Sequence, residues 1–291
     1  MVKIVVSEQY NNKKLDRFIL DTFPTLSRNI LFKALRQKDI KINGKRINEN
    51  TVIKAGDIIE VFIDDKLLNE NPSAKQVELN IIYEDNNLLI INKQPGLEVE
   101  SSTEKSLIDF AKEYLENKGE YTKPSLCHRL DRNTRGLVII AKNDESLKIM
   151  LEKIKNREVK KFYQCVVVGC PNPKKAELRH YLFKDSKKSQ VYIYDTKKTG
   201  CVEIITRYKV IEVYEETSKL EVELITGKTH QIRAHLAHIG HPILGDGKYG
   251  INEINKKHKA KHQILWAYKI IFDFNEAGIL DYLKGKIFKI E

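Results

Sequence analysis

Cysteine is scarce in this sequence, and no two of its four cysteines have the C-x-x-C spacing typical of redox motifs and zinc sites. We therefore expect free thiols in a reducing cytosol. No apolar run approaches the roughly 20 residues needed to cross a bilayer, and the N-terminal residues lack the long apolar core of a signal peptide. These absences predict a cytoplasmic protein with no membrane partner, and we expect a monomer. The four cysteines are Cys127, Cys165, Cys170 and Cys201.

The sequence also lacks the motifs that bind nucleotide or dinucleotide cofactors. The H-E-x-x-H pattern of a zinc-binding helix is absent, and Pro242 would interrupt any helix that reached it. We therefore expect no cofactor and no metal ion, and we assign the histidines to structural hydrogen bonds. The histidines considered as metal ligands are His128, His230, His235, His238 and His241.

Positive charge is in excess along the whole chain. The formal net charge is +11, and the pI is about 9.2. The first 75 residues carry 14 Lys and Arg against 10 Asp and Glu, a net charge of +4, which leaves +7 for the remainder. Nucleic acid is the favoured partner, because Lys and Arg that neutralise phosphates release counterions and gain affinity. A generally lysine-rich protein without a polyanionic partner is the alternative.

Apolar residues at helical spacing predict two short helices near the N-terminus. The first set is Leu15, Phe18 and Ile19, and the second lies between residues 30 and 35. Ser27 is the expected N-cap of the second helix, because its hydroxyl can accept a hydrogen bond from a free amide of the first turn.

A β-hairpin is predicted next, because Asn43-Gly44 lies between residues that alternate polar and apolar from 39 to 47. A further strand is expected over residues 58–63, after Gly56-Asp57. This order of helices and hairpin resembles the S-four RNA-binding domain. A ubiquitin-like or protein-binding module is the alternative. The residues that match the S-four pattern are Leu15-Asp16-Arg17, Ser27-Arg28, Ile40, Asn43-Gly44-Lys45 and Gly56-Asp57.

The resemblance to the S-four domain implies that basic residues of the second helix and the hairpin contact RNA. The chain is accordingly divided into a small α/β RNA-binding domain at 1–65, a linker at 66–76 and a larger domain at 77–291. Pro72 supports the linker, because proline cannot continue a helix or a central strand. The expected RNA-binding residues are Arg17, Arg28, Lys33, Arg36, Lys45 and Arg46.

The larger domain is predicted to be α+β with a mixed, largely antiparallel sheet. β-Branched and aromatic runs separated by turns indicate its strands. Helices are expected at 106–117 and 146–155. The clearest strands are at 88–92, 137–141, 162–168, 219–225 and 264–272.

One acidic side chain, Asp131, lies among Arg129, Arg132 and Arg135, immediately before the apolar run at 137–141. Nearby cations favour the ionised form of a carboxylate. Structural ion pairs perturb carboxylates as readily as catalytic sites do. The local pattern therefore leaves open a surface ion-pair cluster and a catalytic acid.

The run from His128 to Gly136 resembles the HRLDxxTSG signature of the RluA-type RNA pseudouridine synthases. The similarity covers residues 77–275 and includes further segments in the order that the family has. Those segments are Tyr83-Glu84-Asp85, Leu88 to Gly96, Lys161-Phe162-Tyr163 and Thr226 to Arg233.

The resemblance implies the pseudouridine synthase fold and the isomerisation of uridine to pseudouridine in RNA. This reaction breaks the bond between N1 of uracil and the ribose and rejoins the base through C5, so it requires no electron carrier. By resemblance, Asp131 is the essential nucleophile or base, and Arg233 is its ion-pair partner. A buried carboxylate needs such a hydrogen-bonded cation, and Arg keeps its proton.

Three further roles follow from the resemblance. Tyr163 stacks on the flipped uracil, and its hydroxyl is a candidate for proton removal. Arg129 enters the gap that the flipped nucleotide leaves, although a phosphate contact would explain it as well. Leu224 and Ile225 form an apolar floor under the base, or belong to the ordinary core.

Two departures from the family pattern affect the choice of RNA. Asn133-Thr134-Arg135-Gly136 stands where Asp-Thr-Ser-Gly is usual, and Leu97-Glu98 follows Pro95-Gly96 where a His-Pro pair is common. Large-subunit ribosomal RNA is the favoured substrate, and transfer RNA is the alternative. Two rival functions remain, a non-catalytic ribosome-assembly factor and a hydrolase with paired carboxylates. The hydrolase would need a second carboxylate that acts together with Asp131.

Overall fold

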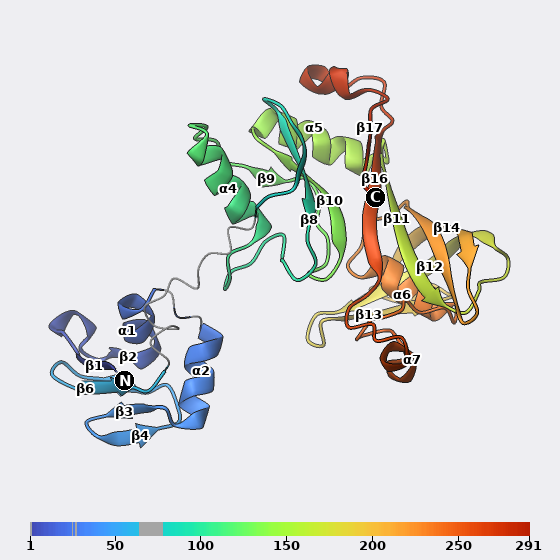
Figure 1. Cartoon of the computed structure of the whole chain (residues 1–291). Coiled ribbons are helices and arrows are strands. Elements are labelled where there is room, and N and C mark those ends of the chain that lie inside the picture. Colours follow the sequence, from blue (N-terminus) through green and yellow to red (C-terminus); the bar gives the residue numbers. More distant parts are fainter. Residues whose placement is uncertain (1, 25, 27, 64–77) are drawn as a thin grey trace. The chain divides into compact units, whose positions relative to one another are not determined.

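The computed structural model describes residues 2–24, 26, 28–63 and 78–291 (Figure 1). The chain divides into two compact units: Met1–Glu78 with Ser101–Lys105, and Leu79–Glu100 with Ser106–Glu291. Ser27, expected as an N-cap, lies outside the described residues, as does the linker expected at 66–76. The domain boundaries at 65 and 77 fall there too and remain predictions.

Two helices pack against a four-stranded antiparallel sheet in the smaller unit, with strand order β1-β6-β3-β4. The apolar residues at helical spacing, including Leu15, Phe18 and Leu31, are buried in its core, which confirms the two expected helices. The elements are β1 (Val2–Val5), η1 (Glu8–Tyr10), β2 (Lys13–Lys14), α1 (Leu15–Thr22), α2 (Arg28–Gln37), β3 (Ile40–Ile42), β4 (Lys45–Ile47), β5 (Val52–Ile53) and β6 (Ile58–Val61).

The expected hairpin is confirmed by β3 and β4, which pair around Asn43-Gly44. Both turn residues have positive φ, 50° at Asn43 and 79° at Gly44, which matches the right-handed twist of the flanking strands. The Asn43 side chain donates to Asp57 at 2.8 Å and accepts from the Ile58 amide at 2.8 Å, so it fixes the turn against β6.

The larger unit is built on an 11-stranded sheet. Nine strands follow the order β13-β12-β14-β15-β11-β16-β10-β8-β7, and the other two are β9, which pairs with β10, and β17, which pairs with β16. β10 and β16 pair in parallel, and the other pairs along this order are antiparallel, so the α+β prediction is confirmed. Its strands are β7 (Ile81–Glu84), β8 (Leu88–Lys93), β9 (Ser125–Leu126), β10 (Arg135–Ala141), β11 (Val159–Val168), β12 (Lys175–Asp185), β13 (Gln190–Tyr194), β14 (Val202–Val213), β15 (Thr217–Leu224), β16 (Leu265–Phe272) and β17 (Ile287–Lys289).

Helices cover both faces of this sheet around β8 and β10. Leu89 of β8 belongs to a core shared with α4 and α6, whereas its neighbour Leu88 belongs to a core shared with α5 and η2. Successive strand residues point to opposite faces, so β8 is apolar along most of its length. The helices are α4 (Leu107–Asn117), α5 (Asp144–Lys155), α6 (Gln231–His238), α7 (Asn252–Lys257) and the short 3₁₀ helix η2 (Gly278–Leu283).

Gly136 lets β10 approach β16 closely. Its φ is +126°, and a Cβ atom there would lie 2.3 Å from the carbonyl oxygen of Ala267, the residue opposite in the parallel pair. A side chain would therefore separate the two strands. The loop that carries Asp131 ends at this point. None of the helices among the described residues has the length and apolar character to cross a bilayer.

Candidate active site

The loop between β9 and β10 carries Asp131, and it is tied to β10 by hydrogen bonds at its start. The Cys127 amide donates to the Ile139 carbonyl at 3.0 Å, and the Ile139 amide donates to Nε2 of His128 at 3.1 Å. Burial, reinforced by the charge of Lys161, lowers the pKa of His128 to about 3. His128 is therefore a neutral acceptor within the loop, and the Asp131 carbonyl closes a turn with the Thr134 amide at 3.0 Å.

Lys93 ties this loop to the end of β8. It is 1% exposed, and its ammonium donates to the carbonyls of Gln94 at 2.9 Å, Leu97 at 2.8 Å and Arg132 at 2.9 Å. Burial lowers the pKa of Lys93 to about 8, although the charge of Asp131 opposes this shift. Three acceptors match the three N–H groups of an ammonium. The sequence analysis gave Lys93 no role. The feature that could have drawn attention to it is its position at the polar end of an otherwise apolar strand.

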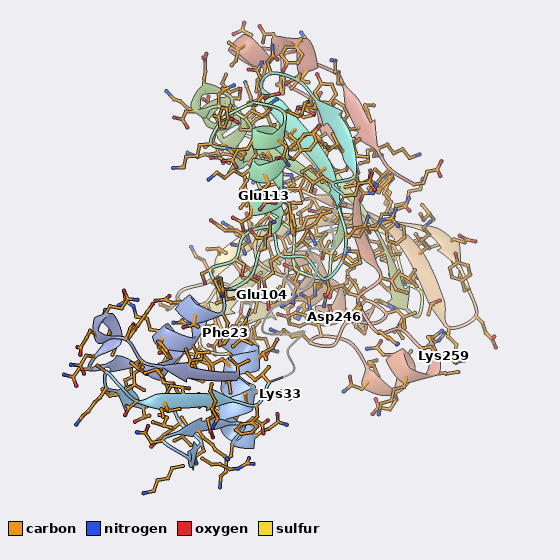
Figure 2. All side chains as sticks on the ribbon, turned by 60° about the vertical axis from the view of Figure 1, so that its left-hand side comes forward. Phe23, Lys33, Glu104, Glu113, Asp246 and Lys259 are labelled. Atoms are coloured by element: carbon orange, nitrogen blue, oxygen red, sulfur yellow. The ribbon has the colours of Figure 1, made fainter. Side chains whose placement is uncertain are left out.

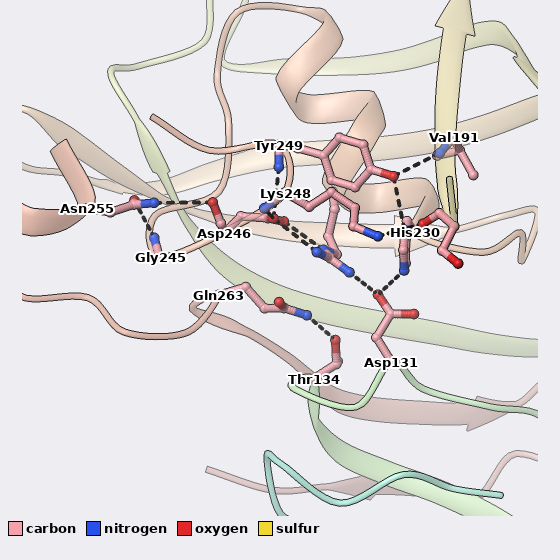
Figure 3. A network of polar contacts seen from close by, with 12 residues as sticks. Asp131, Thr134, Val191, His230, Gly245, Asp246, Lys248, Tyr249, Asn255 and Gln263 are labelled. Carbon is pink, nitrogen blue, oxygen red and sulfur yellow. Dashed lines mark hydrogen bonds and ion pairs between the residues drawn. The ribbon is translucent and has the colours of Figure 1, made fainter. Parts of the chain in front are cut away.

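Asp131 and Arg233 are brought together across 102 residues of sequence, with Nη1 of Arg233 donating to Oδ2 of Asp131 at 2.8 Å (Figure 3). Arg233 lies on α6. Its side chain is 9% exposed, and that of Asp131 is 25% exposed. Such a charge-assisted bond fixes the carboxylate in one orientation. Oδ1 of Asp131 has no hydrogen-bond partner among the described residues.

Asp246 holds the other side of Arg233, and sequence reasoning missed it. Its carboxylate accepts from Nε of Arg233 at 2.6 Å and from Nη2 at 3.0 Å, and Asp246 is fully buried inside the larger unit (Figures 2 and 3). Burial alone would lower the pKa of Arg233, but the hydrogen bonds and charges of Asp246 and Asp131 raise it. The guanidinium is therefore a permanent cation between two acids.

Asp246 is itself fixed by its own loop. Its Oδ1 accepts from the amides of Lys248 at 2.8 Å and Tyr249 at 3.0 Å. Burial would raise the pKa of Asp246, but the Arg233 pair and these amides lower it. Its signal in the sequence is an acid between two glycines, Gly245 and Gly247, after the apolar pair at 243–244.

His230 also approaches Asp131, with Nε2 4.0 Å from Oδ2. Its Nδ1 lies 3.0 Å from the hydroxyl of Tyr249, which accepts from the Val191 amide at 3.0 Å (Figure 3). Burial lowers the pKa of His230, although the charge of Asp131 opposes the shift. A tyrosine hydroxyl that accepts from Val191 can donate to Nδ1, and this leaves the Nε2–H of a neutral imidazole facing Asp131.

Gln231 secures the first turn of α6, two residues before Arg233. Its Nε2 donates to the Ile205 carbonyl at 3.1 Å and to Thr206 Oγ1 at 3.0 Å, both on β14. Its Oε1 accepts from the Thr226 hydroxyl at 2.9 Å and from the Lys228 amide at 3.1 Å. The run at 226–233 therefore forms one hydrogen-bonded unit that sets the direction of Arg233.

A cleft of about 1090 Å³ surrounds these groups. Ten cationic side chains and three acidic ones line it, which gives the cleft a strongly positive field. Burial, with the charge of Asp131, raises the pKa of Tyr163, so its phenol stays protonated. Burial lowers the pKa of Lys161, two residues earlier on β11. The six residues expected at the active centre all line this cleft: Arg129, Asp131, Tyr163, Leu224, Ile225 and Arg233.

The arginines next to Asp131 in sequence have other contacts in the structure. Arg135 donates to the backbone carbonyl of Glu291 at 2.8 Å, and Arg132 donates to the Gly96 carbonyl at 3.0 Å. Arg129 is exposed and lines the cleft. The unusual Arg135 thus contacts the end of the chain.

The basic residues expected to bind RNA in the smaller unit are all exposed. Arg17 lies 4.0 Å from Asp21, and Arg28 lies 3.8 Å from Asp16, so both are within weak surface ion pairs. Lys33 lies on α2 (Figure 2). Arg36 lies on the same helix, and Lys45 and Arg46 lie on β4.

The fold is shared with solved structures of pseudouridine synthases. Human RNA pseudouridylate synthase domain containing 4 aligns with a TM-score of 0.58 and 24% identity, over 73% of this chain and 88% of that chain. Human RNA pseudouridylate synthase domain containing 1 aligns with a TM-score of 0.57 and 23% identity, over 69% of this chain and 81% of that chain. The fold class is therefore the pseudouridine synthase fold.

Sequence comparison gives the family. The family model described as RNA pseudouridylate synthase matches residues 87–238. The ribosomal large subunit pseudouridine synthase C of Rickettsia conorii is 37% identical over 95% of this chain and 94% of the relative. The protein of the same name from Buchnera aphidicola is 34% identical over 89% and 84%. An uncharacterized RNA pseudouridine synthase of Mycoplasma capricolum is 33% identical over 99% and 96%. The chain belongs to the RNA pseudouridine synthase family, in its RluA-type branch, and is an isomerase that acts on RNA.

Proposed function

We propose that the protein converts uridine to pseudouridine in large-subunit ribosomal RNA, with Asp131 as the reacting group. The observation that carries this proposal is the position of Asp131, held by Arg233 inside a cationic cleft beside Tyr163. The names of the relatives from Rickettsia and Buchnera support the choice of RNA. We further propose that the protein works as a cytoplasmic monomer.

Binding of RNA depends on the cations of the cleft, because they neutralise phosphates and release counterions. The target uridine leaves the base stack and enters the cleft, since its glycosidic bond cannot be reached inside a helix. Arg129, at the exposed rim, takes the place of the flipped nucleotide. The ring of Tyr163 forms one wall for the uracil, and Leu224 and Ile225 form an apolar floor.

Asp131 then acts through the oxygen that Arg233 leaves open. Arg233 binds Oδ2, so Oδ1 faces the substrate as nucleophile or base. The bond between N1 and the ribose breaks, the uracil turns, and a bond forms between C5 and the ribose. The hydrogen on C5 leaves as a proton, and N1 gains one, so the reaction needs no oxidant or reductant. Whether Asp131 acts as nucleophile or as base, its carboxylate must be held in a fixed position beside the ribose.

The proposed domain at 1–65 supplies a second cationic surface for the RNA. Its six expected contacts are exposed, so phosphates can reach them, and the surface ion pairs of Arg17 and Arg28 are weak enough to be exchanged for phosphate contacts. Its role is to raise affinity for structured RNA, whereas the chemistry belongs to the larger domain.

The test uses ribosomal RNA labelled with tritium at C5 of uridine. The wild-type protein should release tritium, and Asp131→Asn should release none while it binds RNA as tightly as the wild type. An active Asp131→Asn variant would remove Asp131 from the chemistry. Strand cleavage would indicate a hydrolase, and binding without release by the wild type would indicate an assembly factor. Release from transfer RNA alone would move the substrate to that class.

A further inference from the structure

A second cluster of polar side chains lies at the far end of α6, outside the cleft. His180 of β12, His238 of α6 and Asp195, directly after β13, place one ligand atom each within 4.8 Å of one another. Nε2 of His238 lies 2.7 Å from Oδ1 of Asp195, and Nε2 of His180 lies 3.5 Å from the same oxygen. Two imidazole nitrogens and one carboxylate oxygen thus converge on one point.

The strand register explains how two of these residues meet. Tyr181 and Tyr194 are opposite each other in the β12–β13 pair, so His180 and Asp195 are the next residues outward on the two strands. The side chain of His180 is 19% exposed, that of His238 is 26% exposed, and that of Asp195 is 76% exposed. An ion from solvent can therefore reach this point from the side of Asp195.

A buried relay fixes the ring of His180. Its Nδ1 lies 2.7 Å from Nε2 of His235, whose Nδ1 lies 2.9 Å from Thr206 Oγ1. His235 is fully buried, so the ring of His180 meets a partner that is held in place by the core. If His180 donates from Nδ1 to His235, and His235 donates onward to Thr206, Nε2 of His180 carries a free lone pair toward Asp195.

In that tautomer the arrangement is the one that metal-binding histidines usually have. A ligating imidazole binds the ion through one nitrogen and donates from the other nitrogen to a fixed acceptor, which sets both tautomer and orientation. The sequence led us to expect no metal ion and a structural role for His238; on this geometry we propose instead that His180, Asp195 and His238 form a binding site for a divalent transition metal ion of the Zn²⁺ class. Neutral imidazoles with one carboxylate suit such ions, whereas Mg²⁺ prefers oxygen ligands alone.

The two distances to Asp195 fit a metal after a small adjustment, and the ligand atoms of His180 and His238 lie within 4.8 Å of each other. Zn²⁺ bonds of about 2.0–2.1 Å in a tetrahedral site place ligand atoms roughly 3.3 Å apart. The separation of 3.5 Å between His180 and Asp195 already matches. The hydrogen bond of 2.7 Å between His238 and Asp195 must open by roughly 0.6 Å, which the exposed Asp195 side chain can do by rotation. Water supplies the remaining ligand.

Bound metal would join α6 to the β12–β13 hairpin. His238 is the last residue of α6, and Arg233 lies on the same helix five positions earlier. The residues of the relay reach β14, where Gln231 is also anchored. The ion would therefore hold the helix that positions Arg233, and its role is structural. Metal binding at this site depends on neither the RNA nor the reaction.

The test measures metal binding directly on the tag-free, chelator-treated full chain. Zn²⁺ is titrated against a chromophoric competitor, and Co²⁺ is added as a spectroscopic probe. The variants are His180→Ala, His238→Ala and Asp195→Asn. Asp195 is so exposed that its replacement does not threaten folding. His262→Ala is the matched control, because His262 is an exposed histidine outside the cluster.

We expect one Zn²⁺ per chain, a rise in Tm on its addition, and visible Co²⁺ bands without a thiolate charge-transfer band. Each of the three variants should weaken Zn²⁺ binding by about tenfold or more, and His262→Ala should not. The proposal is overturned if the wild type binds no Zn²⁺, or if Asp195→Asn and His238→Ala bind it as tightly as the wild type. A thiolate band would also overturn it, since the ion would then be on cysteine.

Discussion

Arg233 makes a two-point ion pair with the buried Asp246, at 2.6 and 3.0 Å, and keeps its remaining Nη1 for Asp131. The planar guanidinium has donors on two sides, so one residue can bind a structural acid and a reacting acid together. Asp246 therefore fixes the direction from which Arg233 approaches Asp131.

Replacing Asp246 by Asn should damage both stability and activity. Loss of one partner from a buried ion pair costs about 3–5 kcal/mol of unfolding free energy. An Arg233 displaced by roughly 1 Å would lower turnover by about 100-fold. Denaturant unfolding and tritium release measure the two effects. Asp144→Asn, at an exposed position in the first turn of α5, is the control and should change neither appreciably. Full turnover in Asp246→Asn would show that Arg233 needs no second anchor.

Tyr163 should matter for its ring more than for its hydroxyl. Burial raises the pKa of Tyr163, so its hydroxyl stays protonated at neutral pH and no phenolate is available to accept a proton; Tyr163→Phe should therefore keep most of the turnover. Tyr163→Leu removes base stacking worth about 1–3 kcal/mol, which corresponds to a decrease in rate of about 5- to 150-fold. Single-turnover rates on a uridine-containing RNA distinguish the two variants, and their Tm values show whether both are folded. A severe decrease in Tyr163→Phe would instead give the hydroxyl a part in proton removal.

Lys93 should make stability depend on pH in the alkaline range. Its pKa falls from 10.5 to about 8 on folding because of burial, so the unfolded chain binds more protons between these values. The free energy of unfolding should therefore rise with pH across this window, by up to about 1.4 kcal/mol per pH unit from this one group. The measurement is denaturant unfolding from pH 7 to 10 in the wild type and in Lys93→Met.

The Lys93→Met variant is the reference that removes other titrating groups from the comparison. Its stability relative to the wild type should fall as the pH rises through the window, since it lacks the titrating amine. Parallel pH curves for the two proteins would show that Lys93 keeps an ordinary pKa.

The smaller unit should contribute affinity for RNA through phosphate contacts. Lys33→Gln and Arg36→Gln remove exposed charges from α2. The logarithm of the affinity for RNA falls as the logarithm of the salt concentration rises, and each substitution should make this fall less steep by about 1, because one fewer phosphate is neutralised. Turnover at saturating RNA should not change. Filter binding over a salt series measures the slope. Lys284→Gln, an exposed lysine of the larger unit, serves as the control, and equal slopes in all four proteins would exclude α2 from the RNA interface.

Much of the fold was predictable because it depends on local periodicity. The helices expected at 106–117 and 146–155 correspond to α4 and α5, and the strands expected at 88–92 and 137–141, which were predicted from short runs rich in β-branched residues, correspond to β8 and β10. The hairpin at Asn43-Gly44 follows from the turn residues, which tolerate positive φ. The strand order and the parallel pairing of β10 with β16 were not predictable, because they depend on contacts between distant segments.

The sequence by itself determined the α+β class, the positive charge and, through its motifs, the family and the candidates Asp131, Tyr163 and Arg233. The resemblance also named Arg233 as the partner of Asp131. Only the tertiary structure gave the geometry of that pair across 102 residues, and only it showed that Arg135 contacts Glu291 instead of Asp131. It alone brought Asp246 to Arg233 and Asp195 to His238. The physical reason is that hydrogen bonds and ion pairs act over a few ångströms in space, and the sheet sets those distances between residues that the sequence separates widely.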